Sequence, residues 1–216
     1  MQNSIKAVIF DIDRTLLDTE QYILQAFVHT LQAYNLHSIT KNELNPLMGK
    51  SLEKCYEILA PHENVTALAE THRTFQEKNL QLAVPFPHTI RTLQKIKEHD
   101  IKIAAVTTRT MRTSKRTLEV TGLIPFINAV ISKEDVKPEE LKPHPRPILF
   151  ALELIKSKPE FAVTVGDAKE DIEAGKRAGT KTIGVTYGSS GIQINECHPD
   201  YVIDDIADIL LILQLL

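Results

Sequence analysis

Short apolar segments recur along the chain, separated by stretches with helical spacing. They are residues 5–10, 101–106, 129–131, 161–165, 182–185 and 201–203. Several are apolar at nearly every position, which is typical of parallel strands covered on both faces. Because strands and helices alternate over the C-terminal two thirds of the chain, the pattern predicts a doubly wound α/β sheet.

The helical stretches have recognisable starts. Thr89 can cap a helix whose Ile90, Leu93 and Ile96 are expected to share the buried face, and Pro147 can open another that continues to about residue 155. The apolar C-terminal run 209–216 is much shorter than the ~20 residues that span a bilayer. We therefore expect a packed terminal helix there, with a dimer contact as the alternative.

Residues 18–83 show helical patterns only. Ile23, Phe27, Leu31 and Tyr34 form one apolar stripe, a second begins at Leu52, and a third lies within 65–82. A single crossover helix does not need so many residues. We therefore expect a helical domain at 18–83 inserted into an α/β core of residues 1–17 and 84–216, with connections at 16–19 and 83–87.

The composition narrows the class of protein. The 216 residues are 43% hydrophobic and 25% charged, which is enough to bury a full core. With 25 basic and 28 acidic residues the net charge is -3, so nothing favours binding to nucleic acid or to an anionic membrane. One small basic cluster is spaced like a solvated helix face: Arg109, Arg112, Lys115 and Arg116. The N-terminus does not resemble a signal peptide, and Cys55 and Cys197 lie far apart, so we expect reduced thiols in a cytoplasmic protein.

Two carboxylates follow the first apolar segment directly. Asp11 and Asp13 are two residues apart at the end of the predicted strand, and Thr15 follows them. Two acids so placed can hold a divalent cation, or they can divide nucleophilic and acid–base work between them. An isolated pair of this kind is more often an acidic turn before a helix. The later strand ends therefore decide between these interpretations.

Three later segments also end in polar clusters. Thr107 and Thr108 follow segment 101–106, where their hydroxyl groups and the free backbone N–H groups could bind a phosphate oxygen. Lys142 lies in a loop next to prolines, where its positive charge could offset the negative charge of a phosphate. Gly166-Asp167 ends the fourth segment, and Asp171 follows four residues later. Each cluster has a structural alternative, namely a helix cap, an exposed lysine or capping acids. Because strand ends meet at one crevice in an open α/β sheet, the clusters together predict a site for phosphate and magnesium.

In combination these residues resemble a known family. Asp11-Ile12-Asp13-Arg14-Thr15, Thr107, Lys142 and Gly166-Asp167-x-x-x-Asp171 are similar to the four ordered motifs of the haloacid dehalogenase superfamily, in its phosphatase branch with a helical cap. The chain looks like the phosphoglycolate phosphatases and related inorganic pyrophosphatases of that family. Three positions depart from the usual pattern: Arg14 and His88 stand where glycine is usual, and Ala168 where serine is frequent. We expect the Arg14 side chain to face solvent, with bracing of the cap as the alternative.

The resemblance implies a role for each site residue. Asp11 would attack phosphorus to form an aspartyl-phosphate, and Asp13 would protonate the leaving oxygen and then activate water. Mg²⁺ would be held by Asp11, the Asp13 carbonyl and Asp167, with Asp171 acting through a water. The remaining expected contacts are phosphate binding by Thr107, Thr108 and Lys142, and a substrate contact by Lys50 in the cap loop 48–51.

The expected activity is Mg²⁺-dependent hydrolysis of a small phosphorylated metabolite, such as a phosphoglycolate-like compound, a sugar phosphate or pyrophosphate. A phosphomutase of the β-phosphoglucomutase type is the main alternative, since it shares the first half-reaction. A receiver-like signalling module and a catalytically silent binding protein are less favoured. Dehalogenation is disfavoured because in this family it requires neither the second Asp nor a metal. Both a monomer and a homodimer stay open.

Overall fold

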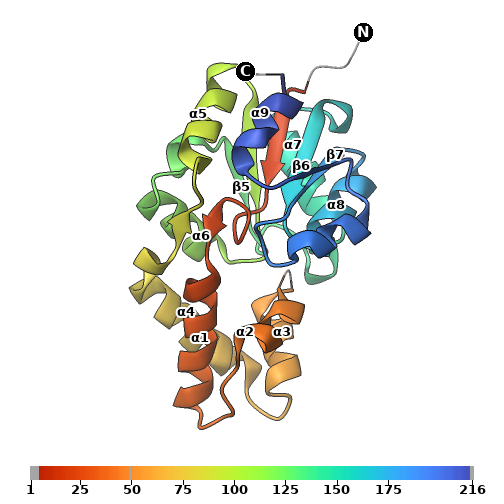
Figure 1. The fold of residues 1–216 in the computed structure, drawn as a ribbon. Helices are drawn as coiled ribbons and strands as arrows, with labels where there is room; N and C mark the ends of the chain where they lie inside the picture. The colour runs from red at the N-terminus through yellow and green to blue at the C-terminus, as the bar shows by residue number, and fades with distance from the viewer. Residues whose placement is uncertain (1–4, 49, 215–216) are drawn as a thin grey trace.

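The computed structural model describes residues 5–48 and 50–214. Within these ranges, six parallel strands form one sheet in the order β5-β4-β1-β6-β7-β8. They are β1 (Ala7–Phe10), β4 (Lys102–Val106), β5 (Ala129–Ile131), β6 (Ala162–Gly166), β7 (Lys181–Val185) and β8 (Tyr201–Ile203). Each of these strands overlaps a predicted apolar segment to within one residue, so the prediction of a doubly wound α/β sheet is confirmed (Figure 1).

Helices cover both faces of this sheet because alternate side chains along each strand point to opposite sides. Val8 and Phe10 belong to a core that includes residues of α5 (Thr89–Glu98), α6 (Met111–Val120) and α9 (Ile209–Ile212). Ala7 and Ile9 belong to a second core with α7 (Arg146–Leu154) and α8 (Lys169–Ala178). All four β1 residues are fully buried, which explains the unbroken apolar run in the sequence.

One helix turns a different face inward from the one predicted. In α5, Leu93 and Ile96 are fully buried as expected, but Ile90 is 46% exposed. The buried face instead begins with Thr89, whose hydroxyl donates to the Leu16 carbonyl at 3.2 Å. Thr89 is therefore the first helical residue, and the N-cap position belongs to the preceding histidine.

Between residues 19 and 83 the chain folds into helices at one end of the molecule (Figure 1). They are α1 (Glu20–Ala33), α2 (Lys41–Leu44), α3 (Leu52–Leu59) and α4 (Val65–Lys78). These helices enclose an apolar cluster of their own, in which the Phe27 ring lies 5.2 Å from the Tyr56 ring and 4.7 Å from the His72 ring. The boundaries 18–83 of a separate cap domain stay a prediction.

The two connections between the helical part and the sheet lie side by side. Strands β2 (Leu17–Asp18) and β3 (Val84–Pro85) pair antiparallel, and the Phe86 N–H donates to the Leu16 carbonyl at 3.2 Å. Both segments were expected to be connections, but their pairing was not predicted from the sequence. The chain therefore leaves and re-enters the α/β part through one short ribbon.

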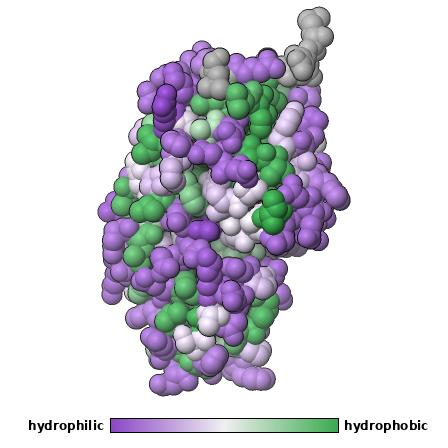
Figure 2. All heavy atoms as spheres, in the orientation of Figure 1, coloured by the Kyte–Doolittle hydropathy of each residue, from purple (hydrophilic) through white to green (hydrophobic). Residues whose placement is uncertain are grey.

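The C-terminal segment packs as a short helix. In α9, Ile209 and Leu210 are buried while Leu211 is 61% exposed, and Figure 2 shows hydrophobic side chains at the surface in this region. The expectation of a packed terminal helix is thus confirmed for 209–212, while residues 215–216 lie outside the described ranges. In the part of the chain that the structure describes, no helix is long and apolar enough to cross a membrane.

Candidate active site

The first strand delivers two carboxylates to its C-terminal edge. Asp11 directly follows β1, and its N–H donates to the Val165 carbonyl of β6 at 2.9 Å, so it still lies in line with the sheet. A tight turn then begins, in which the Leu17 N–H donates to the Ile12 carbonyl at 3.0 Å. Asp13 lies within this turn, and it lines the same cavity as Asp11.

Lys142 lies between two of the predicted acids. Its Nζ lies 2.6 Å from Asp11 Oδ1, 2.5 Å from Asp171 Oδ1 and 3.3 Å from the Val106 carbonyl. Burial alone would lower the pKa of this ammonium, but the carboxylates of Asp11 and Asp171 outweigh that effect and raise the pKa above its usual range. Lys142 is therefore a fixed cation at the end of β1, and not the exposed loop lysine of the alternative interpretation.

The Gly166-Asp167 motif brings the remaining acids to the same point. A Cβ at Gly166 would lie 2.2 Å from the Asp171 Cβ, so only glycine allows the first turn of α8 to approach β6 this closely. Asp171 also caps α8, since its Oδ2 accepts from the Ala168 N–H at 3.1 Å. The capping and site interpretations of Asp171 are thus compatible, because its two oxygens have different partners.

The loop after β7 also contributes to the site, which the sequence analysis did not predict. The Ser189 N–H donates to Asp167 Oδ2 at 2.7 Å, and the Thr15 hydroxyl donates to Asp167 Oδ1 at 3.3 Å. A Cβ at Gly188 would lie 2.1 Å from the Asp167 Cβ. The glycine- and serine-rich run at 188–191 after a predicted strand was the available sequence signal for this loop.

Asp11, Asp167 and Asp171 form a buried group of acids suited to a metal ion. One carboxylate oxygen from each lies within 4.8 Å of the others. Burial raises the pKa of Asp11 well above its usual range, although Lys142 opposes this, and burial together with Asp171 raises the pKa of Asp167 to about 6. One lysine does not neutralise three carboxylates, so a divalent cation would relieve their repulsion, and an all-oxygen donor set suits Mg²⁺.

The two threonines after β4 have different surroundings. Thr107 is buried, and its hydroxyl oxygen accepts from the Arg109 N–H at 3.2 Å, which leaves its own proton free for donation. Thr108 lines a cavity of about 100 Å³ together with Asp11, Asp13 and Lys142. Both predicted phosphate-binding residues therefore lie at the same end of the sheet as the acids.

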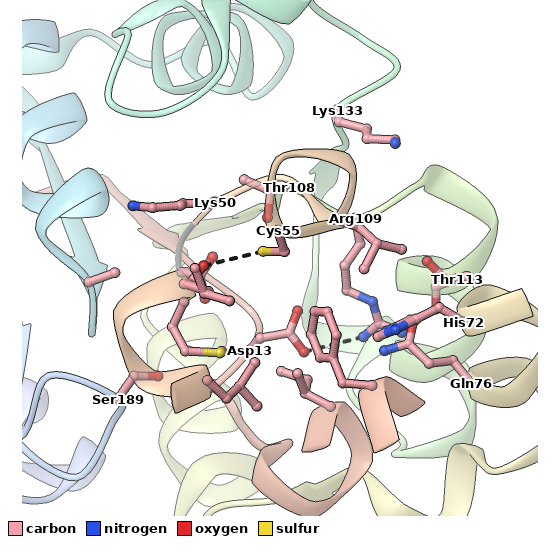
Figure 3. Close-up of a pocket in the computed structure, with 18 of the residues that line it drawn as sticks. Asp13, Lys50, Cys55, His72, Gln76, Thr108, Arg109, Thr113, Lys133 and Ser189 are labelled. Atoms are coloured by element: carbon pink, nitrogen blue, oxygen red, sulfur yellow. Dashed lines mark hydrogen bonds and ion pairs between the residues drawn. The ribbon is translucent and has the colours of Figure 1, made fainter. Parts of the chain in front are cut away.

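Arg109 lies in the site, contrary to the expectation of a solvated helix face. Its side chain is 10% exposed, whereas Arg112 is 80% exposed and Arg116 63% exposed. The reason is that Arg109 precedes α6, whose N-cap is Thr110, and so does not share the helix face of the other basic residues. Figure 3 shows its guanidinium facing Asp13, and Nη1 lies 3.4 Å from Asp13 Oδ1.

The helical part supplies the opposite wall of the cavity. Lys50 lines it and pairs with Glu170 of α8 at 3.6 Å, while its neighbour Gly49 lies outside the described residues. Glu53 of α3 pairs with Arg73 of α4 and, at 2.5 Å, with Lys133, which follows β5. Ion pairs thus join the two parts of the molecule on both sides of the cavity.

The expectation that Arg14 faces solvent is wrong. Its side chain is only 12% exposed, forms ion pairs with Asp18 and, at 3.3 Å, with Glu20, and lies over the Phe86 ring at 5.6 Å. Nη2 also lies 3.5 Å from the Tyr187 carbonyl. These partners belong to both connections, to α1 and to the loop after β7, so the local sequence pattern could not reveal them.

Comparison with known proteins identifies the family. The model of haloacid dehalogenase-like hydrolases matches residues 8–185. Pyrophosphatase PpaX from Anoxybacillus flavithermus is 36% identical and that from Bacillus mycoides 35% identical, each over 97% of both chains.

Among solved structures, a haloacid dehalogenase-like hydrolase from Bacteroides fragilis is 26% identical, with a TM-score of 0.83 over 95% of this chain and 99% of that one. A predicted phosphoglycolate phosphatase from Haemophilus somnus shares the fold with a TM-score of 0.86 at 24% identity, over 96% of this chain and 97% of that one. The chain therefore belongs to the haloacid dehalogenase-like hydrolases, among their phosphatases.

Proposed function

We propose that the protein is a Mg²⁺-dependent phosphatase that transfers a phosphoryl group first to Asp11 and then to water. The observation that carries this proposal is the position of Asp11, which ends β1, borders the cavity and lies beside the Lys142 ammonium. An Asp11 oxygen would bond to phosphorus as the bond from phosphorus to the leaving oxygen breaks. Asp13 would give that oxygen a proton and later take one from the water that hydrolyses the aspartyl-phosphate.

The other residues at the sheet edge would bind the transferring group. Lys142, Thr107 and Thr108 would donate to its oxygens, and a preorganised donor of this kind contributes ~10²–10³ in rate. Asp11, Asp167 and the Asp13 carbonyl would hold Mg²⁺, with Asp171 acting through a water. That ion would supply positive charge next to the phosphoryl oxygens.

Residues 18–83 would act as a cap over a core formed by 1–17 and 84–216. Ion pairs that link the two parts, such as Lys50 with Glu170 and Lys133 with Glu53, support this arrangement. A cap that closes over the site excludes bulk water during the reaction. Lys50 lines the cavity on the cap side, where it would contact the part of the substrate that leaves.

Pyrophosphate is the substrate that we propose first. The curated relatives named above are pyrophosphatases, and they match nearly the whole chain. Apart from the cluster of acids and Lys142, the charged lining of the cavity includes Lys50, Arg73, Arg109 and Lys133. Cationic side chains near the leaving group would suit a charged phosphate better than a neutral sugar.

A panel of pyrophosphate, phosphoglycolate and sugar phosphates, assayed with and without Mg²⁺, tests the proposal. Asp11→Asn should reduce kcat on every accepted substrate by on the order of 10³ or more, because the nucleophile is lost. Its melting temperature should be unchanged or higher, since burial opposes the Asp11 charge. Near-parental turnover by Asp11→Asn, in protein free of wild-type enzyme, would exclude Asp11 as nucleophile. Formation of an isomeric sugar phosphate without release of phosphate would instead identify a phosphomutase.

A further inference from the structure

Arg109 is a buried cation directly beside Asp13. The two side chains are 10% and 16% exposed, and Nη1 lies 3.4 Å from Asp13 Oδ1. Taking a guanidinium out of water is costly unless oxygen atoms surround it. The oxygens that surround Arg109 show which parts of the molecule hold it.

Residues from both parts of the molecule fix this guanidinium. Nη2 lies 2.8 Å from Thr117 Oγ1 and 3.3 Å from the Thr113 carbonyl, both on α6. Nη2 also donates to the Tyr22 hydroxyl at 2.7 Å, and the guanidinium carbon lies 5.0 Å from the centre of the Tyr22 ring. Tyr22 belongs to α1 and is fully buried. Tyr22 therefore links the position of Arg109 beside Asp13 to the packing of α1 against the α/β part.

We propose that Arg109 is a positioning residue that holds the Asp13 carboxyl group for proton transfer to the leaving group, and that Tyr22 holds Arg109. This inference rests on the proposed function, in which Asp13 is the general acid. As the leaving oxygen takes the proton, the O–H bond of Asp13 breaks and a negative charge appears on its carboxylate. The neighbouring guanidinium stabilises that charge and keeps all its own protons, because arginine does not deprotonate in proteins.

Two aryl phosphates of similar size distinguish a role of Arg109 in proton transfer from a role in phosphoryl binding or in structure. The 4-nitrophenyl group leaves as a stable anion without needing a proton, whereas the 4-methylphenyl group leaves more easily when protonated. We expect Arg109→Gln to lower kcat/KM about tenfold more for 4-methylphenyl phosphate than for 4-nitrophenyl phosphate, a part of the ~10²–10⁴ that general acid catalysis contributes. The ratio kcat/KM is used because it reports the first half-reaction alone.

Three further variants complete the design. Asp13→Asn should show the same dependence on the leaving group, and the double variant should lose no more than Asp13→Asn alone. Tyr22→Phe keeps the ring and removes one hydroxyl, so it should show a smaller loss with the same pattern, and it carries the test if Arg109→Gln does not fold. Arg112→Gln is the matched control, because Arg112 is an exposed cation in the adjacent helix and its loss should leave the ratio unchanged. The double-variant comparison is repeated with pyrophosphate, so it does not depend on turnover of aryl phosphates.

Each outcome has a defined meaning. Equal losses on both aryl phosphates would assign Arg109 to phosphoryl binding or to structure, and additive losses in the double variant would separate it from Asp13. Either result overturns the inference. If Asp13→Asn shows the leaving-group pattern and Arg109→Gln does not, only the inference fails. If Asp13→Asn itself loses equally on both, the acid role in the proposed function fails as well.

Discussion

At the scale of single residues, Arg14 occupies a backbone conformation that glycine adopts at lower cost. Its φ is 64°, in the left-handed region, and its side chain forms ion pairs with Asp18 and Glu20. The left-handed conformation costs a residue with a Cβ roughly 1–2 kcal/mol, and partly exposed ion pairs return about 0–1 kcal/mol each. Arg14 is thus tolerated where glycine is usual because its side chain joins the two connections to α1.

A pair of variants separates these two effects. Arg14→Ala loses the ion pairs and keeps the backbone strain, whereas Arg14→Gly loses both. We therefore expect Arg14→Gly to be more stable than Arg14→Ala by about 1 kcal/mol in the free energy of unfolding, measured in urea. Equal stability of the two variants would mean that the turn relaxes around alanine and that the strain argument is wrong.

Some site residues were predicted from the sequence and others were missed. The difference is whether the contacts that place a residue in the site follow from the fold class or involve a distant part of the chain. Asp11, Lys142 and Asp167 each follow a strand, so the fold class alone predicts that they converge. Arg109 also follows a strand, but its burial depends on Tyr22 of α1, which is far away in the sequence. Because spacing within one segment carries no information about such partners, the basic cluster gave a wrong expectation for Arg109.

At the scale of elements, the strands were predictable because each contains an apolar run, and in the central strands β1, β4, β6 and β7 that run is buried on both faces. The face of α5 was not, since Ile90 is more hydrophobic than Thr89 and yet is the exposed one. The hydroxyl of Thr89 reaches the Leu16 carbonyl at the connection, a partner from another element. The pairing of β2 with β3 was missed for a related reason, because two-residue strands carry no periodic pattern.

The contact between β6 and α8 gives the prediction at this scale. Gly166→Ala would place a Cβ 2.2 Å from the Asp171 Cβ, so we expect a loss of about 1–3 kcal/mol in stability together with a loss of turnover. Gly175→Ala is the matched control, because Gly175 lies in α8 like Asp171, but its Cβ would lie 2.8 Å from Thr182 Cγ2 of β7, away from the acids. It should destabilise the protein while leaving kcat per folded molecule unchanged. Unchanged kcat in folded Gly166→Ala would show that the position of Asp171 is not needed for turnover.

At the scale of the whole molecule, a ligand bound by the acids of the site should stabilise the fold. Free Mg²⁺ at 100 times its Kd would add about 2.7 kcal/mol, so it should raise the melting temperature of the apo protein and a chelator should reverse the rise. Asp167→Asn should reduce this response, since it removes one of the three clustered carboxylates. Glu160→Gln is the control, because it removes an exposed acid next to the opposite end of β6. A parental response in Asp167→Asn would contradict the assignment of Asp167 as a ligand.

The pH dependence of stability provides a second test at this scale, through His72 of the helical part. His72 is buried, and its Nδ1 lies 2.9 Å from the Tyr56 hydroxyl. Burial, assisted by Arg73 and Arg109, lowers the pKa of His72 from 6.5 to about 3. The folded protein therefore keeps this ring neutral at pH values where the unfolded chain protonates it. Its contribution to stability is fully present above pH 6.5 and is lost as the pH falls from 6.5 towards 3.

The size of this effect follows from the two pKa values. At pH 5, which is about 1.5 pH units below the ordinary histidine pKa of 6.5, the unfolded chain is protonated at this site, whereas at pH 8 it is neutral. Between these pH values the protein therefore loses about 2 kcal/mol of stability. His72→Gln keeps a polar partner for Tyr56 and cannot titrate, so its stability should fall by about 2 kcal/mol less than that of the parent over the same range. His62→Gln, which removes an exposed histidine, should follow the parent. If urea unfolding at both pH values gives the same loss for His72→Gln as for the parent, His72 is protonated within the folded helices and its burial does not control their acid stability.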